Sequence, residues 1–222
     1  MKNILYISCS VRKYSENETQ HQSISRMLGE QFLSTFSQTT HKIEITHRDL
    51  SVKQPAFIDE AFIAAAFAKG VLSEEQRLVL AESDEIIKEV TNADIIVIAS
   101  PMYNYGMPAV LKAWFDMVIR VNKTFSFDLA RGDKPLEPIL SGKTLVLLAS
   151  WGEFAFKKGE SQYHLNHLSS HIEQLAPYLG AEAFYEIASE YQEFGDNRHK
   201  QSKALAIEEI NNLVHMLSNQ NS

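Results

Sequence analysis

Apolar residues along the chain follow two repeating patterns, one typical of strands and the other of helices. Three apolar runs lack the alternation of a half-exposed strand, so they predict strands covered on both faces of a sheet. In a fourth segment Ile43 and Ile45 alternate with polar residues, which predicts a strand nearer a sheet edge. The segment AEAFYEIAS supplies a fifth. The expected strands are 4–7, 42–50, 93–100, 143–150 and 181–189.

Apolar residues spaced three or four apart predict helices between these strands. The first such segment places Ile24 and Leu28 on one face. Another begins with Ser73 and has Gln76 three residues later, the signature of a capping box. A third opens with Pro108, at a position where a missing N–H does no harm. The expected helices are 23–36, 56–70, 73–93, 108–121, about 162–175 and about 197–217.

Strands that alternate with helices predict a parallel sheet with helices on both faces. Five strands followed by a C-terminal helix fit a flavodoxin-like doubly wound α/β fold. The chain contains no internal repeat, low-complexity tract or linker, so residues 1–222 are expected to form a single domain.

Composition narrows the classes of partner. The 222 residues carry a net charge of −7, which argues against a nucleic acid or an anionic membrane surface as partner. The single cysteine excludes an internal disulfide and is compatible with a reducing compartment. No apolar run approaches the length of a membrane span or a signal segment. We therefore expect a cytoplasmic protein.

In a doubly wound sheet, ligands lie beyond the carboxyl ends of the strands where the winding reverses. The first loop there contains neither G-x-G-x-x-G nor G-x-x-x-x-G-K-[ST], but it is rich in hydroxyls. Ser10, Ser23 and Ser25 are therefore candidates to hold a phosphate at a helix N-terminus, where free N–H groups also point. The alternative is that Ser23 or Ser25 only caps the helix.

Cys9 permits a rival function in the same loop. A cysteine after the first strand suggests a cofactor-free tyrosine phosphatase, which needs C-x-x-x-x-x-R so that an arginine can bind the phosphate. The sixth residue after Cys9 is Ser15, so we expect Cys9 to be a small buried side chain. A phosphorelay receiver is also disfavoured, because no aspartate ends the third strand.

The segment PMYNYGMPAVLKAWFDMVIRVNKTFSF, residues 101–127, resembles the FMN-dependent NADH-azoreductases within the wider group of NAD(P)H:quinone reductases. The likeness covers most of the chain. It includes the first strand, the S-x-S-R of residues 23–26, the P-M-Y-N-[FY] turn, the L-K-x-[WY]-F-D helix and the T-F segment.

The resemblance implies a homodimer that binds FMN at the strand ends. A hydride would pass from NADH or NADPH to the flavin and then to a quinone or azo compound, in a ping-pong scheme. The segment with Phe125 and Phe127 would reach the partner's active site and line an acceptor pocket. The implied FMN contacts are Ser10, Ser23, Ile24, Ser25, Met102, Tyr103, Asn104, Tyr105, Ser150, Trp151, Gly152 and Glu153.

The residue types in the PMYNYG turn suit a flavin. Met102, Tyr103 and Tyr105 can pack on a flat apolar ring. The amide of Asn104 can both donate and accept hydrogen bonds, toward the ring edge or toward a nicotinamide or acceptor. The alternative is a turn that simply buries its aromatics, since asparagine and glycine favour turns in any case.

The third loop departs from the S-R-G-G that is usual in the family. Ser150 and Gly152 match, whereas Trp151 and Glu153 do not. We expect Glu153 to lie near the pyrimidine end of the flavin, where its charge would disfavour negative charge on the ring. It could instead turn to solvent or pair with the lysines at 157 and 158.

Three further features allow other interpretations. His164, His167 and His171 share one face of an expected helix and suggest a metal site, but a solvated face is favoured over a metal. Trp114 and Phe115 are expected in the core or a dimer contact. A flavodoxin-type electron-transfer protein, which stabilises the one-electron-reduced flavin, remains an alternative to a two-electron reductase.

Overall fold

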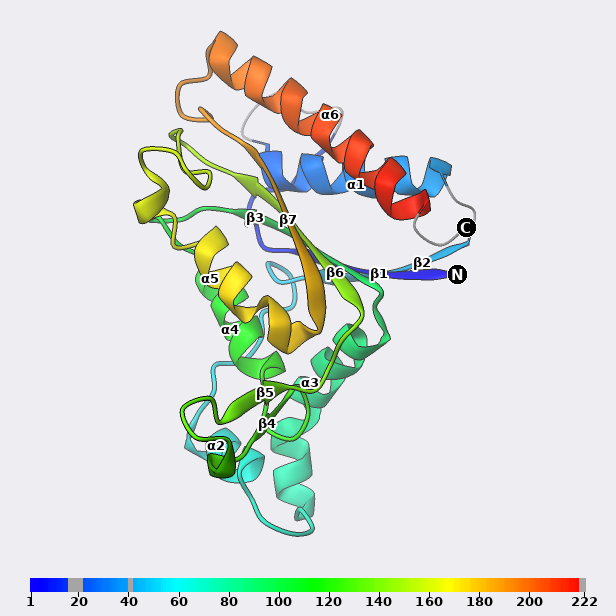
Figure 1. Cartoon of the computed structure of the whole chain (residues 1–222), viewed down its shortest axis with the longest axis vertical. Helices are drawn as coiled ribbons and strands as arrows, with labels where there is room; N and C mark the ends of the chain where they lie inside the picture. Colours follow the sequence, from blue (N-terminus) through cyan, green and yellow to red (C-terminus); the bar gives the residue numbers. More distant parts are fainter. Residues whose placement is uncertain (16–21, 40–41, 220–222) are drawn as a thin grey trace.

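A computed structural model describes residues 1–15, 22–39 and 42–219 of the protein. Its centre is a five-stranded parallel sheet with the strand order β2-β1-β3-β6-β7 (Figure 1). This arrangement confirms the predicted flavodoxin-like α/β fold. The edge position of β2 confirms the expectation drawn from its alternating pattern. The strands are β1 (Lys2–Ser8), β2 (Ile43–Asp49), β3 (Ile95–Pro101), β6 (Lys143–Ser150) and β7 (Ala181–Ser189).

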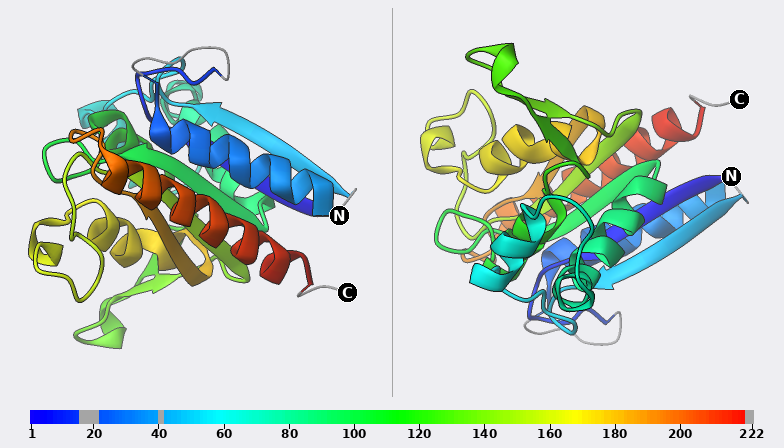
Figure 2. Two further views of the ribbon diagram at one scale, coloured as in Figure 1. Left: turned by 90° about the horizontal axis from the view of Figure 1, so that it is seen from above. Right: turned by 90° about the horizontal axis from the view of Figure 1, so that it is seen from below.

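Helices cover both faces of this sheet. One face carries α1 (Ile24–Thr39) and α6 (Asn197–Asn219), which lie side by side in Figure 1 and in the left view of Figure 2. The other face carries α3 (Glu74–Asn92), α4 (Ala109–Val118) and α5 (Ser169–Leu175). The short helix α2 (Glu60–Ala66) packs beside α3.

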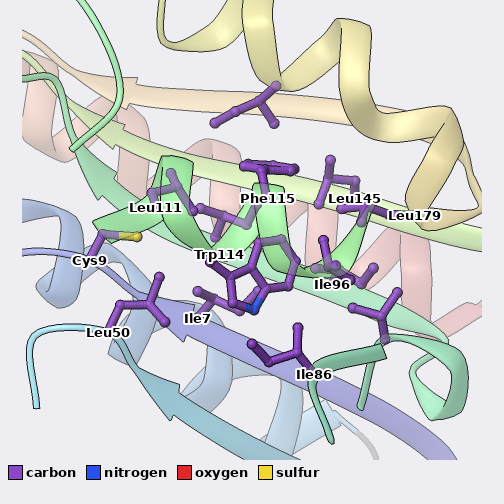
Figure 3. Packing of buried hydrophobic residues seen from close by; sticks show 14 of the residues in the cluster. Ile7, Cys9, Leu50, Ile86, Ile96, Leu111, Trp114, Phe115, Leu145 and Leu179 are labelled. Carbon is purple, nitrogen blue, oxygen red and sulfur yellow. The ribbon is translucent and has the colours of Figure 1, made fainter. Parts of the chain in front are cut away.

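The core beneath α4 is built around two neighbouring aromatic residues. Trp114 is fully buried, and its ring meets that of Phe115 edge to face at 5.0 Å. Figure 3 shows both rings among aliphatic side chains from the sheet, including those of Ile7 and Ile96. This packing confirms that Trp114 and Phe115 belong to the core, and burial of such rings is the main stabilising term for the layer.

Three helices, α2, α4 and α5, are clearly shorter than predicted: α4 ends at Val118, and α2 and α5 begin late, each with a side-chain hydrogen bond to its first turn. The expected helix 56–70 is α2, whose first turn is capped by Asp59 accepting the N–H of Phe62 at 2.8 Å. The expected helix 162–175 is α5, which begins at Ser169, where the Asn166 side chain accepts the Ser169 N–H at 2.9 Å. The capping box of Ser73 and Gln76 on α3 is confirmed.

A small antiparallel hairpin was not predicted. Its strands β4 (Phe125–Phe127) and β5 (Leu136–Pro138) project from the sheet beyond α4 and α5, as the right view of Figure 2 shows. The buried Arg120 anchors its base through hydrogen bonds to Ser83 and Asp84. The strands are only three residues long, which is too short for a periodicity to reveal them.

The two ends of the sheet differ in what they carry. The N- and C-terminal parts of the chain lie at one end, and the loops after β3 and β6 lie at the other (Figure 1). Any site at the carboxyl ends of the strands is therefore far from the start of β1 and from the end of α6. In the described ranges, no helix combines the length and apolar character needed to cross a membrane.

Candidate functional site

A cavity of about 470 Å³ opens at the carboxyl ends of β1, β3 and β6. Its place is the reversal of winding between β1 and β3, where doubly wound sheets bind ligands. Its volume is within the range of sites for small molecules. The lining residues come from five segments: Ser10, Val11, Arg12, Ser23, Ile24, Pro101, Met102, Tyr103, Ser150, Gly152, Gln192 and Glu193.

The start of α1 forms the polar end of this cavity. Ser23 caps the helix, because its hydroxyl accepts the N–H of Arg26 at 3.2 Å. Ser25 is buried behind it, with its hydroxyl 3.2 Å from that of Ser23. The N–H groups of Ile24 and Ser25 donate to no residue within the described ranges. Capping thus leaves donors at the N-terminus of a 16-residue helix, the arrangement that binds phosphates.

The PMYNYG segment forms a tight two-residue hairpin turn. Asn104 and Tyr105 both have positive φ, 49° and 63°, and Tyr103 and Gly106 exchange two hydrogen bonds of 3.0 Å. Positive φ at both central residues is the geometry of a type I′ turn. Met102 and Tyr103 line the cavity, whereas Asn104 and Tyr105 do not.

Tyr105 is held in its unfavourable backbone conformation by the loop after β6. Its carbonyl accepts the N–H of His167 at 2.9 Å, and its ring lies 6.1 Å from that of Phe156. A left-handed conformation costs a residue with a side chain roughly 1–2 kcal/mol. These contacts therefore hold the turn in place against that cost.

The loop after β6 brings only some of its expected residues to the cavity. Ser150 and Gly152 line it, and the Ser150 carbonyl accepts the N–H of Met102 at 3.0 Å. Trp151 is fully buried instead, with its ring 5.5 Å from that of Phe156. Glu153 is not in the lining. The expected pairing partners of Glu153 contact other acids: Lys157 lies 3.8 Å from Glu209, and Lys158 lies 3.6 Å from Glu173.

The segment after β7 supplies lining residues that sequence reasoning missed. Gln192 and Glu193 donate their backbone N–H groups to the carbonyls of Trp151 and Gly152, each at 3.1 Å. The pairing of β6 with β7 is thereby continued past the strand ends. A Cβ on Gly152 would lie 2.8 Å from the Glu193 side chain, so the glycine makes room for this carboxylate. Nothing in EYQEFGD distinguishes it from an ordinary polar loop.

Cys9 has the properties of a buried core residue. Its side chain is fully buried and points into the apolar cluster in Figure 3. Burial raises the pKa of the Cys9 thiol to about 12, although a hydrogen bond with Ser100 opposes the rise. A thiol with this pKa is not a thiolate at neutral pH, and it does not line the cavity. Both observations argue against the phosphatase alternative.

The three histidines do not share a helix face, which corrects the expectation from the sequence. His164 lies in a 3-10 turn (Tyr163–Leu165), and only His171 belongs to α5. Among the residues that the structure describes, no three His, Cys, Asp or Glu side chains are grouped as metal ligands would be.

Phe125 and Phe127 lie away from the cavity of their own chain. Phe125 is half-buried and contacts Tyr178 edge to face at 5.9 Å, and Phe127 is 53% exposed. Phe125 borders a separate groove of about 250 Å³ between α2, α4 and α5. An acceptor pocket formed by these residues would therefore have to belong to another copy of the chain.

Comparison with known proteins places this chain in a family. Residues 2–214 match the family described by a flavodoxin-like fold. FMN-dependent NADH:quinone oxidoreductase 2 of Colwellia psychrerythraea is 50% identical over 218 residues, which cover 98% of this chain and 100% of the relative. The protein of the same name from Idiomarina loihiensis is 49% identical over 219 residues, 98% of this chain and 91% of the relative.

Solved structures agree on the fold. An FMN-dependent NADH-azoreductase from Bacillus anthracis, solved in complex with FMN, has a TM-score of 0.83 at 17% identity, covering 99% of this chain and 100% of that one. The chain thus belongs to the family with the flavodoxin-like fold, and its relatives at about half identity are FMN-dependent NADH:quinone oxidoreductases. The resemblance inferred from the PMYNY and LKAWFD motifs is confirmed.

Backbone strain at Tyr105 predicts an unusual order of stability. Tyr105→Gly and Tyr105→Ala both remove the ring, but only glycine relieves the left-handed conformation. We expect the glycine variant to be more stable by about 0.5–1 kcal/mol, after its larger unfolded-state entropy is allowed for. Urea unfolding measures this difference.

Tyr103 provides the matched control, because it lies in the same turn without a positive φ. There the order should reverse, with Tyr103→Ala more stable than Tyr103→Gly by about 0.4–1 kcal/mol. The same order at both positions would show that strain at Tyr105 does not contribute to stability.

Proposed function

We propose that the protein is an FMN-dependent NAD(P)H oxidoreductase that reduces quinones, azo compounds or both by two-electron transfer. The observation that carries the proposal is the cavity itself. At one end it has hydroxyls and the helix N–H groups that bond to no acceptor in the described ranges, and at the other the Met102–Tyr103 turn, in a chain half identical to a named FMN-dependent NADH:quinone oxidoreductase.

The residues of the cavity divide into two functional groups. At the polar end, Ser10, Ser23 and the N–H groups of Ile24 and Ser25 would hold the FMN phosphate, since neutral donors at a helix N-terminus suit a dianion. At the other end, Met102 and Tyr103 with the loop Ser150–Gly152 would hold the ring. Asn104 and Tyr105 adjoin this end through the turn.

FMN, when bound, supplies the redox chemistry, accepting a hydride from NADH or NADPH and passing two electrons to the acceptor. The protein would orient the ring, exclude water from one face and admit donor and acceptor in turn. No acid or base from the chain is required, because water can supply the protons of the reduced acceptor.

The proposal predicts a measurable cofactor and a characteristic rate law. Denatured protein should release one FMN per chain, and apoprotein should rebind added FMN. Steady-state rates with NADH or NADPH against a quinone and an azo dye should give the parallel double-reciprocal lines of a ping-pong scheme.

Two results would count against this function. Failure both to release and to bind FMN would remove the cofactor claim. FMN that neither nicotinamide reduces would favour the flavodoxin-type electron-transfer alternative instead.

A homodimer with active sites at the interface completes this proposal. The groove between α2, α4 and α5 is lined mostly by apolar side chains, and aromatic residues around it are exposed, Phe57 by 77% and Phe67 by 63%. Exposed apolar patches of this kind mark protein contacts. A second copy covering the groove would also bring Phe125 and Phe127 toward a neighbouring cavity.

A charge placed in the groove should separate the subunits. Phe67→Glu is expected to sediment as a monomer at micromolar concentration, where the wild-type protein sediments as a dimer, because it would bury an unpaired carboxylate. Leu205→Glu is the control, since Leu205 is 59% exposed on α6, across the sheet from the groove. A fully active wild-type monomer would contradict the proposal.

Cytoplasmic localisation remains part of the proposal. The buried, unpaired thiol of Cys9 supports a reducing compartment, where disulfides are rare.

The electronic role first expected of Glu153 belongs, in our proposal, to Glu193. Glu193 lines the cavity beside Gly152, at the end assigned to the flavin ring, whereas Glu153 does not line it. A carboxylate there disfavours the negative charge that the ring gains on reduction. At about 4 Å in a water-like medium such a repulsion is about 1 kcal/mol, which corresponds to about 20 mV for a two-electron couple.

Glu193→Gln should therefore raise the two-electron midpoint potential of bound FMN by about 20 mV. Glu153→Gln, the matched control in the adjoining segment, should leave it unchanged. Potentiometric titration of both variants and the wild type decides the matter. Equal midpoints in all three proteins would assign both carboxylates to solvent.

A further inference from the structure

We propose that Arg26 is the positioning residue of the phosphate end of the cavity. It would act by holding Ser10 and Ser23 at a set separation rather than by touching the ligand. This inference rests on the proposed binding of FMN. Its basis is that Arg26 is hydrogen-bonded to both of these serines, which line the cavity from opposite sides of the first loop.

The side chain of Arg26 binds the end of β1. Nε and Nη2 donate to the carbonyl oxygen of Ser10, at 3.1 and 2.7 Å, and Nη1 donates to the hydroxyl of Ser8 at 3.0 Å. Val11, which follows Ser10, is 67% exposed and belongs to no helix or strand. The guanidinium therefore fixes Ser10 where regular structure no longer does.

The backbone of Arg26 fixes the second serine. Its N–H donates to the Ser23 hydroxyl at 3.2 Å, which sets the cap of α1. One residue thus joins the cap of the helix to the end of the strand. The separation of the two serines that line the cavity depends on this link.

Asp49 and Ser51 hold the guanidinium in turn. Asp49, the last residue of β2, accepts two hydrogen bonds of 2.7 Å from Nη1 and Nη2, and the Ser51 hydroxyl accepts one of 2.9 Å. Burial alone would raise the pKa of Asp49, but the hydrogen bonds from Arg26 and Ser51 outweigh burial and lower the pKa to about 2. The carboxylate is therefore charged throughout the neutral range.

The contacts leave Arg26 no donor for a ligand. The guanidinium has five N–H groups. Its six hydrogen bonds go to Ser8, Ser10, Asp49 and Ser51. A phosphate in the cavity would therefore be bound by the serines and helix N–H groups, and Arg26 would determine only where these stand.

Arg48 offers a matched control for the purely structural effect of losing such a network. It precedes Asp49 on β2 and points to the opposite face, as neighbouring residues on a strand do. Its buried guanidinium binds Glu89 twice at 2.6 Å and Glu85 once at 2.7 Å. It does not line the cavity, so its loss should affect stability alone.

The test compares two flavins that differ only in the phosphate. Dissociation constants of FMN and riboflavin are measured by fluorescence titration of apoprotein for the wild type, Arg26→Gln and Arg48→Gln. For Arg26→Gln we expect the FMN constant to rise about tenfold or more, the size of a lost charge-assisted hydrogen bond. Its riboflavin constant, and the absorption spectrum of FMN bound at saturation, should stay at the wild-type values. Arg48→Gln should change neither constant.

Each other outcome has a distinct meaning. Wild-type protein that binds no FMN overturns the proposed function. Wild-type protein that binds FMN, with Arg26→Gln unchanged or with an altered spectrum of bound FMN, overturns the role of Arg26 alone. If Arg26→Gln does not fold, Arg26→Lys is used, because lysine keeps the charge but loses the planar fork. An FMN constant for Arg26→Lys equal to that of the wild type also overturns the role.

Discussion

The parallel pairing of β1 with β3 and of β3 with β6 is the constraint on which the rest of the site depends. Ser8 stands opposite Ala99, and Pro101 stands opposite Ser150. Three loops must therefore leave the sheet side by side, and hydrogen bonds continue across the strand ends from Cys9 to Ala99 and from Met102 to Ser150. Because helices cover both faces of the sheet, a ligand can reach it at the carboxyl ends of the strands, where the loops emerge.

Beyond the strand ends, the loops hold one another. The segment after β7 pairs with the segment after β6, which in turn supports the PMYNYG turn through His167 and Phe156. Arg26 joins the start of α1 to the ends of β1 and β2. The cavity wall is thus formed by loops that hydrogen-bond to one another. The left-handed backbone conformation of Tyr105 is tolerated because these contacts hold it in place.

Fold class and the location of the site followed from local patterns. Apolar runs in β1, β3 and β6 and the alternation in β2 identified the strands, because burial on two faces or on one imposes different periodicities. The PMYNY and LKAWFD motifs indicated the family before any geometry was known. Caps made by neighbouring residues, such as Ser73 with Gln76, were also predictable, since both partners lie within one turn.

Other features were decided only by tertiary structure, because their causes lie between residues distant in the sequence. Glu193 reaches the cavity through backbone pairing with Gly152, which lies far away in the sequence, whereas Glu153 stays outside the lining. Trp151 lies in the loop that was expected to contact the flavin, but its side chain is buried against Phe156. The link from Arg26 to Asp49 spans 23 positions. Sequence by itself determined the five strands of the central sheet, the helices that cover it and the end of the sheet where a ligand is expected, and packing of the loops decided which side chains line the cavity.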